Sequence, residues 1–270
     1  MGRACSQRSG RPGGARSRAN PLAGLVLFAL SVSLTACTST PSSAPSSTSA
    51  PAGSSTTATS GTTTTTLPPT LGSYVPLFPF GTVQDVQSWQ ESFTSGGSQP
   101  WHLDAGQTAL AFATWLGFTE IDTVVSVRTD VAGAHVSVGF RTPESVTGVS
   151  TAAVVHEVRW GTGNEAPWEV VGTDDTTFSL TDPAYGSEVT STLTVGGLIS
   201  GVDENITVQV RTGSSTVGTI CCLPAGGQDT PWSTAVSFSA PSGSVLTIAA
   251  QTGGHVAGVE RFTVTGVRNR

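Results

Sequence analysis

A histidine and a carboxylate that could form a catalytic pair stand two residues apart, at His102 and Asp104. An imidazole beside an acid is a common arrangement for a general base. The same stretch also fits a structural interpretation, in which Trp101 and Leu103 lead into a helix that Asp104 caps. We favour the capping interpretation, because Gln107 follows Asp104 at the spacing of a capping box.

Two further pairs of polar residues have types that can bind a metal ion. His156 and Glu157 are adjacent in a predicted strand, where neighbouring side chains point to opposite faces, so they cannot bind one ion together. His156 shares its face with Val154 and is interpreted as a histidine packed at the edge of the core. Asp174 and Asp175 have the chemistry of a calcium site, and a turn between domains explains them as well. Because the sequence contains no nucleophile elbow, phosphate loop or spaced zinc ligands, we predict no catalytic residue, no metal and no cofactor.

The adjacent pair Cys221-Cys222 is the third place where chemistry is expected. Neighbouring Cα atoms are about 3.8 Å apart, below the usual disulfide range that starts near about 4.4 Å, so a disulfide between them is strained. One hypothesis is a vicinal disulfide that stiffens the loop 213–229. A second is a redox switch or a contact for a soft metal, and a third is a pair of small residues, one of them buried.

Tryptophan is concentrated in one part of the chain. Five of the six tryptophans are at positions 89, 101, 115, 160 and 168. Aromatic side chains at this density either line a ligand pocket or build the core of a region that is poor in Leu and Ile. If they line a pocket, the candidate ligand-binding residues are Trp101, His102 and Trp115.

The N-terminal residues predict export and anchoring. Residues 1–20 carry five arginines and no acid, and the apolar stretch 21–36 is shorter than the about 18 residues that span a membrane. This pattern predicts a signal peptide over residues 1–36. The run Leu34-Thr35-Ala36-Cys37 resembles the lipobox of bacterial lipoproteins. That resemblance implies lipidation of Cys37, cleavage before it, and attachment to the extracytoplasmic face of the cell membrane.

Residues 37–73 form a predicted tether. After Cys37 they are almost entirely Ser, Thr, Pro, Ala and Gly, without charge. Such a composition cannot build a core and favours extended conformers. We therefore expect a disordered stalk between the anchor and the folded domains.

The region 74–176 is predicted to be a small α+β domain. Helices are expected after the caps Thr82 and Asp104, the second ending at Gly117. Beyond Gly117 the hydrophobic period changes from 3.6 to 2, which indicates antiparallel strands joined first by a turn at 130–133. The expected strands are 123–128, 134–141, 152–160 and 168–173.

The region 177–270 is predicted to be an immunoglobulin-like β-sandwich, so the predicted fold class is mostly β, with the α+β domain preceding the sandwich. Seven short strands in about 90 residues are typical of such a sandwich. They are expected at 177–180, 189–196, 206–211, 216–220, 232–238, 245–250 and 261–267.

Several motifs in this second region resemble the immunoglobulin-like domain of bacterial spore germination proteins. They are Pro183, Gly186, Val189, the run Leu193-Thr194-Val195-Gly196-Gly197, the strand that starts at Glu204, and the strand led by Trp232. The resemblance implies an extracytoplasmic interaction module without catalytic residues, and it does not imply germination. The Cys221-Cys222 loop and the stretch 251–255 depart from the pattern, which leaves the partner surface open.

The net charge of the chain after the predicted signal peptide limits the classes of partner that it can bind. From Cys37 onward there are seven Arg, no Lys and 18 Asp or Glu, a formal charge of −11 (7 − 18). This balance argues against nucleic acid or an anionic lipid surface as a partner. The sequence thus predicts a non-catalytic binding module of the envelope, anchored by lipid, whose partner is another envelope protein or a glycan. The alternative is a small-ligand carrier or an enzyme that uses the Trp-rich α+β domain.

Overall fold

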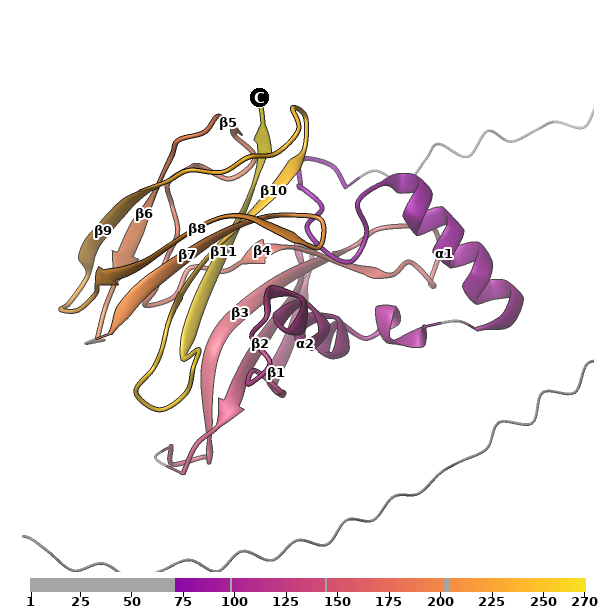
Figure 1. Cartoon of the computed structure of the whole chain (residues 1–270). Coiled ribbons are helices and arrows are strands. Elements are labelled where there is room, and N and C mark those ends of the chain that lie inside the picture. Colours follow the sequence, from indigo (N-terminus) through magenta and orange to yellow (C-terminus); the bar gives the residue numbers. More distant parts are fainter. Residues whose placement is uncertain (1–70, 98, 144, 202–203) are drawn as a thin grey trace, which may run out of the picture. The chain divides into compact units, whose positions relative to one another are not determined.

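The structure is a computed structural model that describes residues 71–270 apart from 98, 144 and 202–203, and Figure 1 shows the arrangement of its elements. The described chain is mostly β, with two α-helices, an antiparallel sheet and a sandwich-like region, which confirms the predicted fold class. Cys37, the predicted signal peptide and nearly all of the predicted tether lie outside the described residues. No helix within 71–270, where described, is long and apolar enough to cross a membrane.

Both helices begin at the caps that the sequence indicates. Helix α1 (Val83–Gly96) starts after Thr82, whose side chain accepts a hydrogen bond within a complete capping box. Helix α2 (Ala105–Leu116) starts after Asp104 and ends at Gly117, which has a left-handed φ of 92°. Glycine adopts this conformation without the steric cost that a Cβ would impose, which explains where α2 stops.

A four-stranded antiparallel sheet in the order β1-β2-β3-β4 follows the helices. Its strands are β1 (Thr123–Asp130), β2 (Gly133–Arg141), β3 (Val149–Arg159) and β4 (Trp168–Thr173). Figure 1 shows α2 lying across this sheet, and the fully buried side chains Phe112, Val136 and Val155 belong to the core cluster that includes both elements. The strands agree with the predicted ones to within a few residues.

The remaining strands form the sandwich-like region. They are β5 (Glu188–Val189), β6 (Leu193–Ile199), β7 (Asn205–Thr212), β8 (Ser215–Pro224), β9 (Thr230–Val236), β10 (Val245–Thr252) and β11 (Arg261–Asn269). A five-stranded sheet has the order β5-β11-β10-β7-β8, and β6 pairs with β9. The predicted strand 177–180 is wrong: Phe178 makes only an isolated bridge to Ile199. The segment soon reaches Pro183, which has no N–H with which to extend a ladder.

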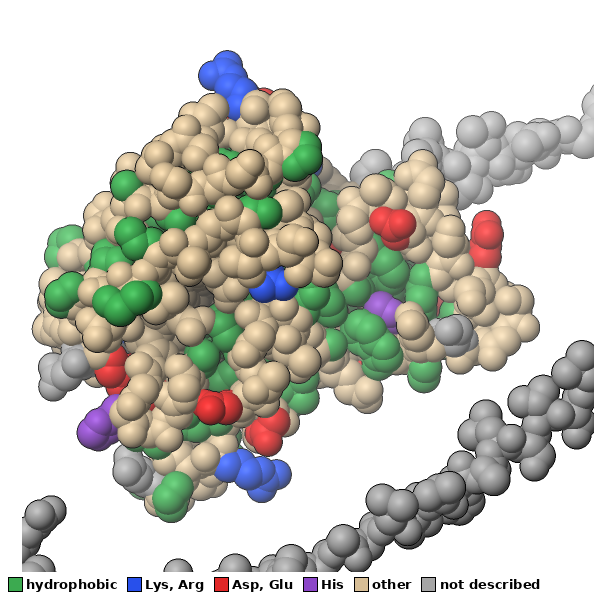
Figure 2. Space-filling view, in the orientation of Figure 1, with side chains coloured by type: hydrophobic (Ala, Val, Ile, Leu, Met, Phe, Trp, Pro, Cys, Tyr) green, Lys and Arg blue, Asp and Glu red, His purple; other side chains and the backbone are tan. Residues whose placement is uncertain are grey.

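The two predicted domains share one hydrophobic cluster. Phe262 and Val264 of β11 belong to the same buried cluster as α2 and the four-stranded sheet. Gln209 also donates a 3.1 Å hydrogen bond to the carbonyl of Leu116 at the end of α2. The boundary between 176 and 177 stays a prediction, and side chains from both sides of it are available to build one site. Figure 2 shows that charged side chains are sparse on the face in view, in keeping with the low content of charged residues.

Candidate functional site

His102 lies inside an aromatic cluster. A short 3-10 helix (Pro100–Leu103) stacks its ring on Trp101, with 3.6 Å between centroids, and Phe80 and Trp89 lie 5.0 and 5.1 Å away. The side chain is only 3% exposed, and burial lowers its pKa to about 4. The imidazole is therefore neutral at pH 7 and enclosed by rings.

The predicted pairing of His102 with Asp104 is not assembled. Asp104 accepts a 2.9 Å hydrogen bond from the backbone N–H of Gln107, which is the capping role, while His102 Nε2 faces the side-chain oxygen of Gln99 at 3.1 Å. Among the described residues, no hydrogen bond or ion pair joins His102 to Asp104. The structure thus agrees with the capping interpretation of Asp104.

Trp101 and Trp115 meet at Phe78, whose ring centroid lies 6.2 and 5.7 Å from theirs. The Arg211 guanidinium also lies over the Trp115 ring, 4.4 Å from its centroid, so Trp115 connects α2 with β7. The three predicted ligand-binding residues are thus close together, with packing contacts that account for their position. Their role in ligand binding stays a prediction.

Cys221 and Cys222 lie in β8, with their sulfur atoms joined as a disulfide. The register of β7 and β8 skips here, so that the two cysteines lie opposite the single residue Thr207 and form a β-bulge. Cys222 has a φ of 72°, a region that residues with a Cβ seldom adopt. Both side chains are exposed at the free edge of the five-stranded sheet.

Two carboxyl groups are buried, of which the sequence singles out Glu157 only as a neighbour of His156 and does not single out Glu169. Glu157 and Glu169 are completely buried, and neither oxygen of Glu157 has a hydrogen-bond partner among the described residues. Burial raises the pKa of Glu157 well above its usual value, and the nearby Glu169 and Asp104 raise it further. Burial also raises the pKa of Glu169, although the backbone N–H of Phe80 donates a 3.1 Å hydrogen bond to it.

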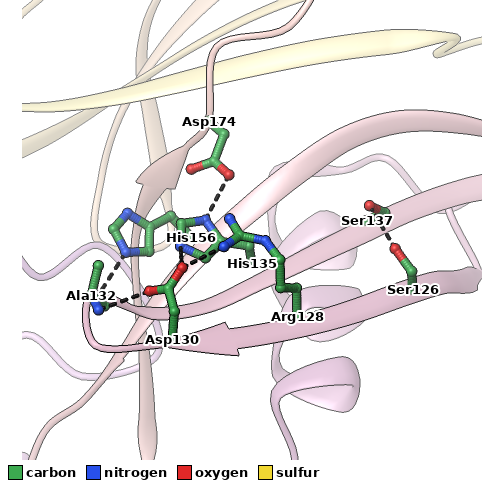
Figure 3. Close-up of polar contacts among 8 residues, drawn as sticks. All are labelled: Ser126, Arg128, Asp130, Ala132, His135, Ser137, His156 and Asp174. Carbon is green, nitrogen blue, oxygen red and sulfur yellow. Dashed lines mark hydrogen bonds and ion pairs between the residues drawn. The ribbon is translucent and has the colours of Figure 1, made fainter.

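A second histidine cluster lies on the opposite face of the sheet from α2 (Figure 3). The sequence singles out His156 and Asp174 separately, but not His135 or the meeting of the three. His135 Nδ1 is 2.6 Å from Asp174, and its Nε2 is 3.6 Å from Asp130. Arg128 pairs with Asp130, and the hydrogen bond from the Ala132 N–H is the main cause of the lowered pKa of Asp130. The carboxylates fix the orientation of the His135 ring.

His156 stacks on His135, and one of its ring nitrogens has no hydrogen-bond partner among the residues that the structure describes. The two residues are direct partners in the β2–β3 register, and their rings are 4.6 Å apart and nearly parallel. His156 Nε2 lies 3.2 Å from the carbonyl oxygen of Ala132. Because a carbonyl only accepts, Nε2 must donate, which leaves Nδ1 of the neutral ring as an acceptor. A Cβ at Gly133 would lie 2.1 Å from the Glu157 carbonyl oxygen and 3.3 Å from His156 Nε2, so glycine allows β2 and β3 to approach closely here.

A small pocket of about 220 Å³ opens beside His156. Its walls come from four separate parts of the chain: the segment before α1, strands β3 and β4 with the residues after them, the turn before β5, and β11. The lining side chains with polar groups are Tyr74, His156, Thr173, Asp175, Tyr185, Thr263 and Thr265. We refer to this cavity as the His156 pocket.

Several polar groups of the His156 pocket are not used within the described protein. Tyr185 is engaged, because its hydroxyl accepts a 2.7 Å hydrogen bond from Val75 N, and burial raises its pKa to about 12. By contrast, no described residue is a hydrogen-bond partner of the Tyr74 hydroxyl, the Asp175 carboxylate or the Thr265 hydroxyl. These groups, together with Nδ1 of His156, are available to a ligand.

The sequence carried only a weak signal for this site. The alternation within each strand places His135 and His156 on one face of the sheet, where they are direct partners in β2 and β3. The turn at 130–133 sets the register of β1 and β2. The remaining walls could not be placed, because Tyr74 and Tyr185 are 111 positions apart (185 − 74) and meet only through the folded arrangement.

Comparison with known proteins returns no match. No protein-family model, no curated protein and no solved structure matches the chain. The resemblances to bacterial lipoproteins and to the immunoglobulin-like domain of spore germination proteins stay predictions.

Proposed function

We propose that this chain is a membrane-anchored extracytoplasmic lipoprotein that acts as a non-catalytic binding module of the cell envelope. The observation that supports binding most directly is the His156 pocket, because it presents polar groups that the described protein leaves unused. Lipid on Cys37 would hold the module at the membrane, and residues 37–73 would carry it outward.

The alternative is an enzyme or a small-ligand carrier in the Trp-rich region. The buried carboxyls Glu157 and Glu169 favour it, since strongly raised carboxyl pKa values are frequent at functional sites. Against it, His102 is enclosed by aromatic rings, and Asp104 caps α2. A carrier that used Trp101 or Trp115 would show quenching of tryptophan fluorescence when an apolar ligand is added.

The anchoring part of the proposal is tested by expressing the full-length chain in a bacterium that processes lipoproteins, with radiolabelled palmitate. We expect label and membrane association for the wild type, and loss of both in Cys37→Ala. Cys5→Ala is the matched control, because it removes a cysteine that lies within the predicted signal peptide, and it should behave as wild type. An unlabelled wild-type protein in the soluble fraction would contradict the proposal.

The binding part is tested by a pull-down of envelope components from detergent-solubilised cells, comparing the anchored protein with the Cys37→Ala variant. A partner captured only with the anchored form supports a role in a membrane complex. Capture of neither a protein nor a glycan by either form would count against the module.

A further inference from the structure

We infer that the His156 pocket binds one uncharged, hydroxyl-rich ring, that is, a single neutral sugar unit of a glycan. This inference rests on the binding role proposed for the same pocket and adds the chemical class of the ligand. It follows from the size of the pocket, its charge, its hydrogen-bonding groups and its apolar surface.

Size limits the ligand to about one ring. The pocket has a volume of about 220 Å³, whereas pockets for drug-sized ligands measure about 300–1,000 Å³. A longer glycan would have to leave most of its units outside. Tyr185 stands at the pocket with 42% of its surface exposed, so its ring is available to a neighbouring unit.

Charge argues against an anionic ligand. The lining includes Asp175 but no Lys or Arg, and Asp130 and Asp174 lie close by around His135. An anion would lose its hydration without gaining a cationic partner. A cation is less disfavoured, but Asp175 is exposed, and an exposed carboxylate attracts a cation only weakly through water.

The unused hydrogen-bonding groups match hydroxyls. The carboxylate of Asp175 only accepts, and so does Nδ1 of His156 when the ring is neutral and Nε2 donates to Ala132, so the ligand must donate to them. The hydroxyls of Tyr74 and Thr265 both donate and accept. A sugar hydroxyl can form a hydrogen bond with each of these groups, because it is both a donor and an acceptor, whereas an ammonium group only donates.

Part of the lining is apolar, as a sugar ring requires. Val171 and Leu180 contribute to the pocket beside the polar groups, whereas the side chain of Val264 belongs to the core cluster with α2. Sugar rings carry C–H groups on their faces and hydroxyls around their rim. An apolar surface with polar groups placed around it fits that division.

The test compares ligands that share one ring and differ in charge. D-glucose, D-galactose, D-mannose and N-acetyl-D-glucosamine are the neutral probes, glucosamine the cation and glucuronate the anion. They are titrated against the full-length protein in detergent micelles by calorimetry. We expect at least one neutral sugar to bind at least tenfold more tightly than both charged rings.

Isosteric variants assign the binding to the pocket. Tyr74→Phe and Thr265→Val each remove one hydroxyl and should weaken binding of the neutral sugar about fivefold. Asp175→Asn keeps an acceptor and should change it about two- to threefold. Glu91→Gln on α1, away from the pocket, is the charge control and should leave binding unchanged.

Two outcomes would overturn the inference. One is tighter binding of glucosamine that is lost in Asp175→Asn, which would make the ligand an amine and leave the binding module intact. The other is no binding of any neutral probe, or neutral binding that none of the pocket variants alters. The broader proposal would fail in a different way: the wild-type protein would show neither palmitate label nor membrane association, and the pull-down would capture no partner.

Discussion

His102 and His156 occupy two polar–aromatic clusters that look alike in the sequence and differ in the fold. Each histidine has a carboxylate within two residues and tryptophan or tyrosine nearby. His102 is closed in by Trp101, Phe80 and Trp89, whereas His156 lies at a pocket, and no described residue bonds its second ring nitrogen. Spacing along the chain therefore indicates chemistry less reliably than the register between strands.

The largest expected difference between the two clusters is the loss of stability when a side chain of the His102 cluster is removed. Phe80→Ala removes a buried ring that stacks on His102, and we expect the free energy of unfolding to fall by about 3–5 kcal/mol. Urea unfolding followed by fluorescence measures this change. A loss below about 1 kcal/mol would mean that the His102 cluster is not a packed core.

The pH dependence of the His102 cluster is the next largest effect. Its pKa of about 4 lies below the unfolded value of 6.5, because burial disfavours the charged ring. Between these two values His102 binds a proton in the unfolded chain but not in the native state. The free energy of unfolding therefore falls as pH drops from 6.5 towards 4, by up to about 2–3 kcal/mol. His102→Gln should remove this component from the unfolding curves. Equal slopes in the two proteins would rule out a buried neutral imidazole.

Glu157 should lower the free energy of unfolding as pH rises, whereas His102 lowers it as pH falls. Its raised pKa keeps it protonated in the native state while the unfolded chain is ionised, so its contribution to stability is present below about pH 4.5 and is lost as pH rises through the folded pKa. Glu157→Gln should flatten this decline by up to about 1.4 kcal/mol per pH unit. Unfolding measured at several pH values between 5 and 8 tests it, with Glu91→Gln as the exposed control. A variant that declines as steeply as wild type would contradict the burial of this carboxyl.

The cysteine pair should matter least for global stability. A bridge between adjacent residues closes almost no loop, so Cys221→Ser with Cys222→Ser should change the free energy of unfolding by less than about 1 kcal/mol. Hydrogen exchange around Thr207 should speed up locally, because the φ of 72° at Cys222 is no longer held. Mass spectrometry of the unreduced protein that finds two free thiols would refute the disulfide itself.

The local elements could be predicted from the sequence because their signals are local. Thr82 and Asp104 mark the helix starts, Gly117 marks a helix end, and alternation marks most strands. The alternation of residues 177–180 predicts a strand, yet this segment forms only a bridge.

The site could not be predicted in the same way. The His156 pocket needs β11 beside β4, which is where Thr173 donates to the carbonyl of Val264 and accepts from its N–H. It also needs Tyr185 to reach Val75, a contact between residues on the two sides of the predicted domain boundary. Neither the hydrophobic period nor the spacing of residues predicts these contacts, because they depend on how whole elements pack.

The most direct measurement of the central claim is an NMR titration of the histidine ring signals of the full-length protein with the neutral sugar that binds best. The four histidines report on separate places, since His135 and His156 are stacked at the pocket, His102 is in the aromatic cluster, and His255 is in the loop before β11. We predict that the His156 signals shift, with a smaller shift for His135, while those of His102 and His255 stay in place. Shifts at His102 with none at His156 would move the ligand site to the aromatic cluster and contradict the account.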